Sequence, residues 1–184
     1  AEMTCLFTAE TLAKASSEEV NQAINAAFVY DDFAWQKERG IRISTPTRAE
    51  GLHKVLYQCP HCKIECRMRS KGTELICDAC GKHWQMDEYG SLRAIEGETE
   101  FSHIPDWYEW ERANVRREVE AGTYSFSAPV RVMSLPNTSG YIHIGDGILT
   151  HGMDGFTVCG SGDYGAFEMI KPVPSLYSCH IELN

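Results

Sequence analysis

Apolar residues in the first part of the chain recur at the spacing of an amphipathic helix. Four of them follow the steps i, i+4, i+7 and i+8: Val20, Ile24, Ala27 and Phe28. Ser16 and Glu19 form the capping-box signature that marks the start of such a helix. The pattern predicts a helix of about three turns, with shorter helices over 9–14 and 33–39. We expect its apolar residues to pack in a core together with Trp35.

The pattern changes to a period of two near residue 124. Apolar residues then alternate with polar ones: Tyr124, Phe126, Ala128, Val130 and Val132. Alternation of this kind indicates strands with one buried face, and the glycine-containing pairs Asp146-Gly147 and Asp154-Gly155 predict turns between them. Further strands are expected over 141–144, 148–150, 156–159, 166–170 and 176–183. Closely spaced turns favour an antiparallel sheet or partial barrel.

A longer helix is predicted between these regions, over 102–121. Ser102 is a suitable N-cap, Pro105 is tolerated in the first turn, and Gly122 ends the pattern. Trp107 and Trp110 lie three residues apart and therefore on the same side of this helix. We expect them to pack the helix against a sheet.

Four of the eight cysteines form two Cys-x-x-Cys pairs, Cys59 with Cys62 and Cys77 with Cys80, separated by 14 residues. Thiolates are soft ligands, and two such pairs supply the four sulfurs of a tetrahedral Zn²⁺ site. A redox role for either pair needs a thioredoxin-like βαβ context, which the pattern lacks. The sequence therefore predicts a zinc ribbon. Because four thiolates leave no open coordination position, the zinc is expected to be structural.

Three neighbouring residues are alternative ligands for this site. Cys66, His61 and His83 lie close to the pairs in the sequence, so a Cys₃His site that uses one of them is an alternative to the four-cysteine site. Cys66 is expected on the outgoing strand instead. Each histidine is expected to be a neighbour of the metal site rather than a ligand.

The segment between the pairs, over 63–72, is typical of a strand that enters a turn at Lys71-Gly72. Period-two alternation places four basic residues on one face of this strand: Lys63, Arg67, Arg69 and Lys71. One interpretation is a solvated face of a small hairpin. The other is a contact with phosphate groups, either of nucleic acid or of anionic lipid head groups.

Taken together, the patterns predict an α+β fold with N-terminal helices, a zinc ribbon, one longer helix and an antiparallel β sheet or partial barrel. Four consecutive segments follow: helices over 1–50, the ribbon over 51–93, a linker and amphipathic helix over 94–123, and a β module over 124–184.

Length, charge and hydropathy argue against several classes of protein. The chain has 184 residues and a formal net charge of −9, which argues against a protein that coats nucleic acid by bulk attraction. No apolar run reaches the ~18–20 residues of a membrane-spanning helix, and the start lacks the basic and apolar regions of a secretory signal. We expect a cytoplasmic protein, in which paired cysteines bind metal rather than form disulfides.

A catalytic constellation is hard to assemble from this sequence. The β half carries several candidate acid and base groups: His143, Asp146, His151, Asp154 and His180. Their spacing fits no metal or triad rule, and the polarity of loops explains them equally well. A small enzyme built on these groups is the third and weakest hypothesis for function.

Four sequence segments carry a resemblance to a known family. They are YDDFAWQ (30–36), RAEGLHKVLYQCP (48–60), WQMDEYG (84–90) and IPDWYEWE (104–111). These strings resemble the region downstream of the catalytic domain in bacterial phospholipid/glycerol acyltransferases of the 1-acylglycerol-3-phosphate acyltransferase type. The similarity spans nearly the whole chain.

The resemblance implies a part of the enzyme that does not perform catalysis. Enzymes of that family resemble one another in a His-x4-Asp motif, in which the histidine acts as a base on the acceptor hydroxyl and the aspartate orients it. No histidine in this chain has an aspartate five residues later. The resemblance therefore assigns no catalytic residue to this chain.

The leading hypothesis is an accessory zinc-ribbon and β module of such an acyltransferase, with its catalytic domain upstream in the same polypeptide. Scaffolding, recognition of anionic lipid head groups and partner binding are the roles it implies, at the inner face of the membrane through the parent enzyme. A strand pattern that stops within 175–184 agrees with a fragment. The alternative is an independent zinc-ribbon module that binds nucleic acid or another protein.

Overall fold

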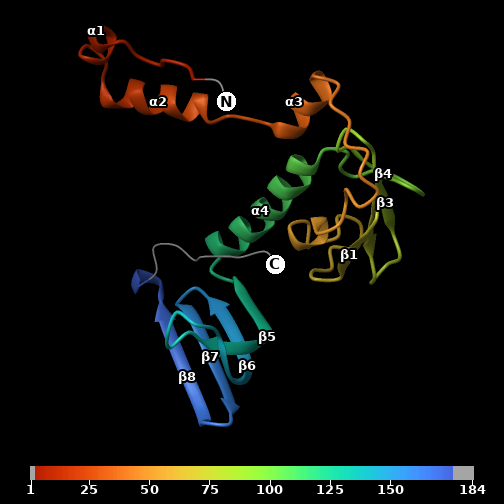
Figure 1. The fold of residues 1–184 in the computed structure, drawn as a ribbon, viewed down its shortest axis with the longest axis vertical. Helices are drawn as coiled ribbons and strands as arrows, with labels where there is room; N and C mark the ends of the chain where they lie inside the picture. The colour runs from red at the N-terminus through yellow and green to blue at the C-terminus, as the bar shows by residue number, and fades with distance from the viewer. Residues whose placement is uncertain (1–2, 176–184) are drawn as a thin grey trace. The chain divides into compact units, whose positions relative to one another are not determined.

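The computed structural model describes residues 3–175 and has the predicted α+β fold (Figure 1). N-terminal helices precede a cysteine-bearing sheet, one longer helix and a second antiparallel sheet. The chain divides into two compact units between Trp107 and Tyr108. This division lies inside the longer helix, within the segment predicted as linker and helix.

Three short helices begin the chain: α1 (Ala9–Leu12), α2 (Ser17–Ala27) and α3 (Asp32–Glu38). The predicted capping box is present, since the Ser16 N–H donates to Glu19 Oε2 at 2.8 Å and the Glu19 N–H donates to Ser16 Oγ at 3.2 Å. The prediction that this helix packs in a core is wrong, because α2 buries no side chain and Phe28 is 82% exposed. Local capping bonds, not tertiary packing, define this helix.

Helix α3 is attached to the rest of the first unit by polar contacts. Gln36 is buried and donates to the backbone carbonyls of Ile41 at 2.9 Å and Glu88 at 3.2 Å. Asp31 caps the helix at Ala34 and meets His103 Nε2 at 2.6 Å. Trp35, predicted as a core residue, is 41% exposed because the buried position on α3 is taken by Gln36.

The first sheet contains four antiparallel strands in the order β1-β2-β3-β4. The strands are β1 (Met68–Lys71), β2 (Glu74–Cys77), β3 (His83–Met86) and β4 (Leu92–Ala94), preceded by the 3-10 turn η1 (Leu52–Lys54). Gly72, with φ of 62°, forms the predicted turn between β1 and β2. The strand predicted over 63–72 begins only at residue 68, since Lys63 and Cys66 have φ of 65° and 55° and leave the extended conformation.

The core of the first unit lies on one face of this sheet. Alternating strand residues supply it: Met68, Leu75, Cys77, Trp84, Met86, Leu92 and Ala94. The longer helix, α4 (Ile104–Glu120), begins here and contributes Ile104 and Trp107, both buried. The expectation that α4 packs a tryptophan against a sheet is confirmed for Trp107.

The second sheet is an antiparallel meander in the order β5-β6-β7-β8. Its strands are β5 (Ser125–Ser134), β6 (Ile142–Gly152), β7 (Gly155–Gly162) and β8 (Gly165–Pro172), followed by the 3-10 turn η2 (Val173–Ser175). The turn predicted at Asp154-Gly155 joins β6 to β7. The strand predicted over 176–183 lies outside the described residues.

The turn predicted at Asp146-Gly147 is wrong, because β6 runs through it without interruption. A β-carbon on Gly147 would lie 2.6 Å from the carbonyl oxygen of Cys159, and one on Gly145 would lie 2.3 Å from that of Ser161. The neighbouring strand approaches too closely for a side chain. These glycines therefore serve close backbone approach, the other use of glycine inside a strand.

Candidate metal centre

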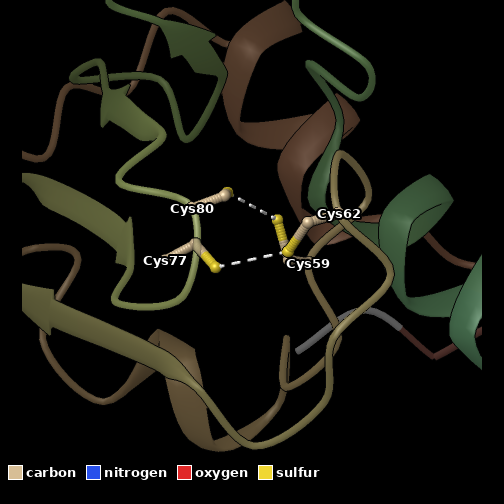
Figure 2. Close-up of side chains that lie close together, drawn as sticks. All are labelled: Cys59, Cys62, Cys77 and Cys80. Carbon is tan, nitrogen blue, oxygen red and sulfur yellow. Dashed lines mark hydrogen bonds between the residues drawn. The ribbon is translucent and has the colours of Figure 1, made fainter.

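The four predicted cysteines meet at one point, where two knuckles face each other (Figure 2). Their sulfur atoms all lie within 4.8 Å of one another. Cys59 Sγ is 3.8 Å from Cys80 Sγ, and Cys62 Sγ is 3.7 Å from Cys77 Sγ. Disulfide sulfurs are bonded at about 2.05 Å, so these are separate thiols. A Zn–S distance of about 2.3 Å in a tetrahedron places sulfurs about 3.8 Å apart.

The two knuckles have the same backbone geometry. In the first, the Cys59 N–H donates to Ile64 O at 3.0 Å and the Lys63 N–H donates to Cys59 O at 2.9 Å. In the second, the equivalent bonds join Cys77 to Lys82 O at 2.9 Å and Gly81 to Cys77 O at 2.8 Å. The residue after the second cysteine of each knuckle has positive φ, 65° at Lys63 and 76° at Gly81. Two distinct sequences thus form one repeated turn, with the paired cysteines at equivalent positions.

Burial and hydrogen bonding shift the pKa values of thiols in this cluster in opposite directions. Cys59 and Cys77 are buried, Cys62 is half-buried and Cys80 is exposed. Burial raises the pKa of the Cys59 thiol, and the smaller desolvation of the Cys80 sulfur raises the pKa of that thiol as well. At Cys62 the effect of burial is outweighed by hydrogen bonds, the backbone N–H of Ile64 first among them, and the pKa is lowered. A cation held by all four sulfurs removes the cost of ionising them, because it pairs with each thiolate.

The three alternative ligands, His61, His83 and Cys66, lie outside the sulfur cluster. His61 Nδ1 lies 3.3 Å from a carboxylate oxygen of Glu100, and His83 Nδ1 lies 3.8 Å from one of Glu74. Cys66 is exposed and does not belong to the sulfur cluster. Among the described residues, the cluster contains four cysteines and no histidine.

One carboxylate links the two knuckles, and no sequence pattern indicated it. Glu100 accepts a hydrogen bond from Lys82 Nζ at 2.5 Å and one from the Trp84 indole at 3.3 Å, and it faces His61. The Lys82 side chain is only 10% exposed, and its ammonium also donates to Glu98 O. A single glutamate in a loop follows no spacing rule, so only the folded chain identifies it.

The four basic residues predicted on one strand face are not gathered there. Lys63 lies in the first knuckle and donates to Pro60 O at 2.5 Å. Arg69 pairs with Asp78 at 3.1 Å, and Lys71 stands opposite Glu74 in the strand register. Arg67 is exposed just before β1. Acidic neighbours therefore offset much of the positive charge of this hairpin.

The polar groups of the β half are distributed along the sheet. His143 and His151 lie near opposite ends of β6. His143 pairs with Asp146 at 3.1 Å, while His151 contacts the Tyr124 hydroxyl at 3.0 Å and stacks on Phe156 at 3.8 Å between ring centroids. Asp154 lies in the turn between β6 and β7. His180 is outside the described residues, so the described part of the chain does not collect this set into one site.

The described part of the chain holds no helix that combines the length and apolar character needed to cross a bilayer. No family model matches the sequence, and neither the curated proteins nor the solved structures contain a match to it.

Proposed function

We propose that Cys59, Cys62, Cys77 and Cys80 bind one structural Zn²⁺. The observation that supports this is the spacing of the sulfurs: all four lie within 4.8 Å of one another, and two of the separations, 3.7 and 3.8 Å, match the edge of a tetrathiolate zinc site. Zinc would supply a cross-link between the knuckles. A closed set of four thiolates leaves no position for water or substrate, so its role is to fold the ribbon rather than to catalyse a reaction.

Metal substitution tests the site. Purified protein is expected to contain one equivalent of zinc, and Co²⁺ in its place should give the absorption bands of a tetrahedral tetrathiolate complex. Cys77→Ser should lose these bands or shift them, whereas Cys66→Ser should leave them unchanged because Cys66 is exposed and outside the cluster. Iron as the native metal, or equal effects of the two substitutions, would contradict the proposal.

We further propose that the chain is a non-catalytic accessory module of a bacterial phospholipid/glycerol acyltransferase. The four segments that resemble that family support it, as does the missing His-x4-Asp motif. Among the roles implied, scaffolding or protein contact fits best. The basic residues of the hairpin have acidic neighbours, which weakens the case for lipid head groups or nucleic acid.

The full polypeptide encoded by the native gene provides the test. It should contain an upstream domain with a His-x4-Asp motif and should transfer an acyl chain to 1-acylglycerol-3-phosphate. Cys77→Ser in that enzyme should reduce activity or the amount of folded enzyme, with Cys66→Ser as the matched control. A gene that begins at this module, or tight binding of the module to nucleic acid but not to the enzyme, would contradict the proposal.

A further inference from the structure

A cavity of about 510 Å³ lies beside the hairpin that β3 and β4 form in the first unit (Figure 1). Its volume is that of a pocket for a small ligand. Two arginines line it, Arg48 from the segment before η1 and Arg93 from β4. None of the four clustered cysteines lines it, and neither arginine belongs to the basic residues of the β1–β2 hairpin. A role for this cavity is therefore separate from the metal centre.

The guanidinium of Arg48 is held in a fixed orientation. Its Nε donates to Met86 O at 2.9 Å and to Asp87 O at 3.1 Å, and its Nη1 donates to Thr45 O at 3.3 Å. These bonds use only part of the donor set of a guanidinium. Within the described part of the chain nothing accepts a hydrogen bond from Nη2. A fixed, half-buried cation thus lines the cavity with N–H donors to spare.

Arg93 brings a second cation to the same place. It stands opposite Gln85 in the β3–β4 register, and both side chains are on the exposed face of the sheet. Gln85 immediately precedes Met86, whose carbonyl holds Arg48, so both arginines are anchored to neighbouring residues of one hairpin. Among residues 3–175, neither Arg93 nor Gln85 has a side-chain hydrogen bond or an ion pair.

Two carboxylates also line the cavity, but each is engaged elsewhere. Asp87 Oδ1 accepts hydrogen bonds from the backbone N–H groups of Tyr89 at 2.8 Å and Ser91 at 2.9 Å. Glu88 Oε2 accepts one from Arg42 Nε at 2.6 Å. Asp87 is thus stabilised by backbone dipoles and Glu88 by a cation of its own. Neither serves as the counter-ion of the two arginines that line the cavity.

The arrangement favours one class of ligand. A guanidinium pairs in bidentate fashion with carboxylate or phosphate oxygens. A carboxylate has one charge, whereas a phosphate monoester carries close to two above its second pKa of about 6 and has three terminal oxygens. Two guanidinium groups, the Gln85 amide and the Ser91 hydroxyl match the phosphate better.

We propose that this cavity binds a phosphate monoester, with Arg48 and Arg93 as the groups that pair with its oxygens. The monoester belongs either to a small soluble molecule or to a lipid head group, since both present the same dianion. The proposal does not depend on the identity of the metal or on the acyltransferase role.

Titration of the zinc-loaded protein with inorganic phosphate tests the site. At neutral pH and constant ionic strength, the amide signals of residues 85–93 and the Nε–Hε signal of Arg93 should shift in a saturable way, and chloride should not reproduce the shift. Arg93→Gln should raise the Kd at least about tenfold, because charge-assisted hydrogen bonds are lost. Arg93→Lys, which keeps the charge but not the fork, should raise it less.

The matched control is Arg67→Gln. It removes the same charge from an exposed position of the same unit that does not line the cavity, so the Kd should stay within about twofold. Equal effects of Arg67→Gln and Arg93→Gln would show bulk attraction and overturn the proposal. A lack of saturable shifts with phosphate, or benzoate binding as tightly as phosphate, would also overturn it.

Vesicles distinguish the two sources of the monoester. Phosphatidylcholine vesicles with and without phosphatidic acid, whose head group is a phosphate monoester, are sedimented with the protein and with Arg93→Gln. Sedimentation that needs both phosphatidic acid and Arg93 would support the proposal and identify a lipid head group. Saturable phosphate binding without such sedimentation would support it and identify a soluble ligand.

Discussion

Trp84 and Trp107 meet edge to face in the core of the first unit, with 5.1 Å between their ring centroids and 63° between their planes. Both side chains are fully buried. The Trp107 indole also donates to Gln58 O at 3.0 Å, one residue before Cys59, the first cysteine of the sulfur cluster. The start of α4 therefore completes the core of a ribbon that is too small to bury a core by itself.

We expect Trp107→Ala to reduce the free energy of unfolding of the zinc-loaded first unit by about 3–5 kcal/mol, because it removes a large buried side chain and leaves a cavity. Trp35→Ala, at a position that is 41% exposed, is the matched control and should cost about 1 kcal/mol or less. The free energy of unfolding of each variant is measured by denaturant titration, with hydrogen exchange of the ribbon amides as the probe. Equal losses in the two variants would show that Trp107 does not hold the core.

Glu100 is expected to matter for stability although it lies outside the metal cluster. Glu100→Gln leaves the largely buried Lys82 ammonium without its carboxylate, and we expect a loss of about 1–3 kcal/mol for a charged group left without its partner. Glu96→Gln, in the same loop and exposed, should change stability by less than about 0.5 kcal/mol. Thermal unfolding of the zinc-loaded variants separates them. No difference between the two would contradict the role assigned to Glu100.

The stabilisation that the Asp31 N-cap gives to α3 should depend on pH. The hydrogen bond from the Ala34 N–H, and less strongly the contact with His103, hold the pKa of Asp31 below the ordinary value of an aspartate. Because the folded-state pKa is lowered, the cap contributes fully above the ordinary value, about 3.9, and its contribution is lost as the pH falls through the lower folded value.

The chemical shift of the Ala34 amide should therefore change, and its protection relative to the intrinsic exchange rate should fall, only in that acidic range. In Asp31→Asn, which keeps a capping oxygen but does not titrate, neither the chemical shift nor the protection of this amide should change over the same range. A titration of Ala34 that persists in Asp31→Asn would assign the effect to another group.

Gly81 should tolerate no side chain without loss of metal affinity. Its φ of 76° is unfavourable for other residues, although nothing within 4 Å would obstruct a β-carbon. We expect Gly81→Ala to cost about 1–2 kcal/mol, close to a tenfold loss of zinc affinity in competition with a chromogenic chelator. Gly97→Ala has the same strain, φ of 75° in open space, but lies outside the knuckles and should affect stability more than affinity. An unchanged affinity in Gly81→Ala would refute the strained-turn account.

Features that depend on local chemistry were predictable from the sequence. The cysteine spacing indicated the four residues that the structure brings together. The capping box joins Ser16 to Glu19, only three positions later. The hairpin turn at Gly72 followed from one glycine. In each case the interacting groups lie within a few residues of one another or follow a known spacing rule.

Features that depend on distant contacts were not predictable. Gly147 looked like a turn residue because its close approach to β7 involves Cys159, about 12 positions away along the chain. Lys63 looked like a strand residue because the left-handed turn of a knuckle is usually recognised by glycine. Phe28 looked like a core residue because the periodicity of a helix identifies an apolar face but not what covers it.

Metal removal from the intact chain is the most direct test of the central claim, that zinc folds the ribbon. Amide spectra of isotopically labelled protein are recorded with one equivalent of zinc and again after complete removal by a chelator, with metal content measured in both samples. Binding free energy is folding free energy in modules of this kind. We therefore predict that the dispersed signals of residues 52–93 collapse while those of β5–β8 remain. Retention of the dispersed ribbon signals in fully metal-free protein would contradict the account.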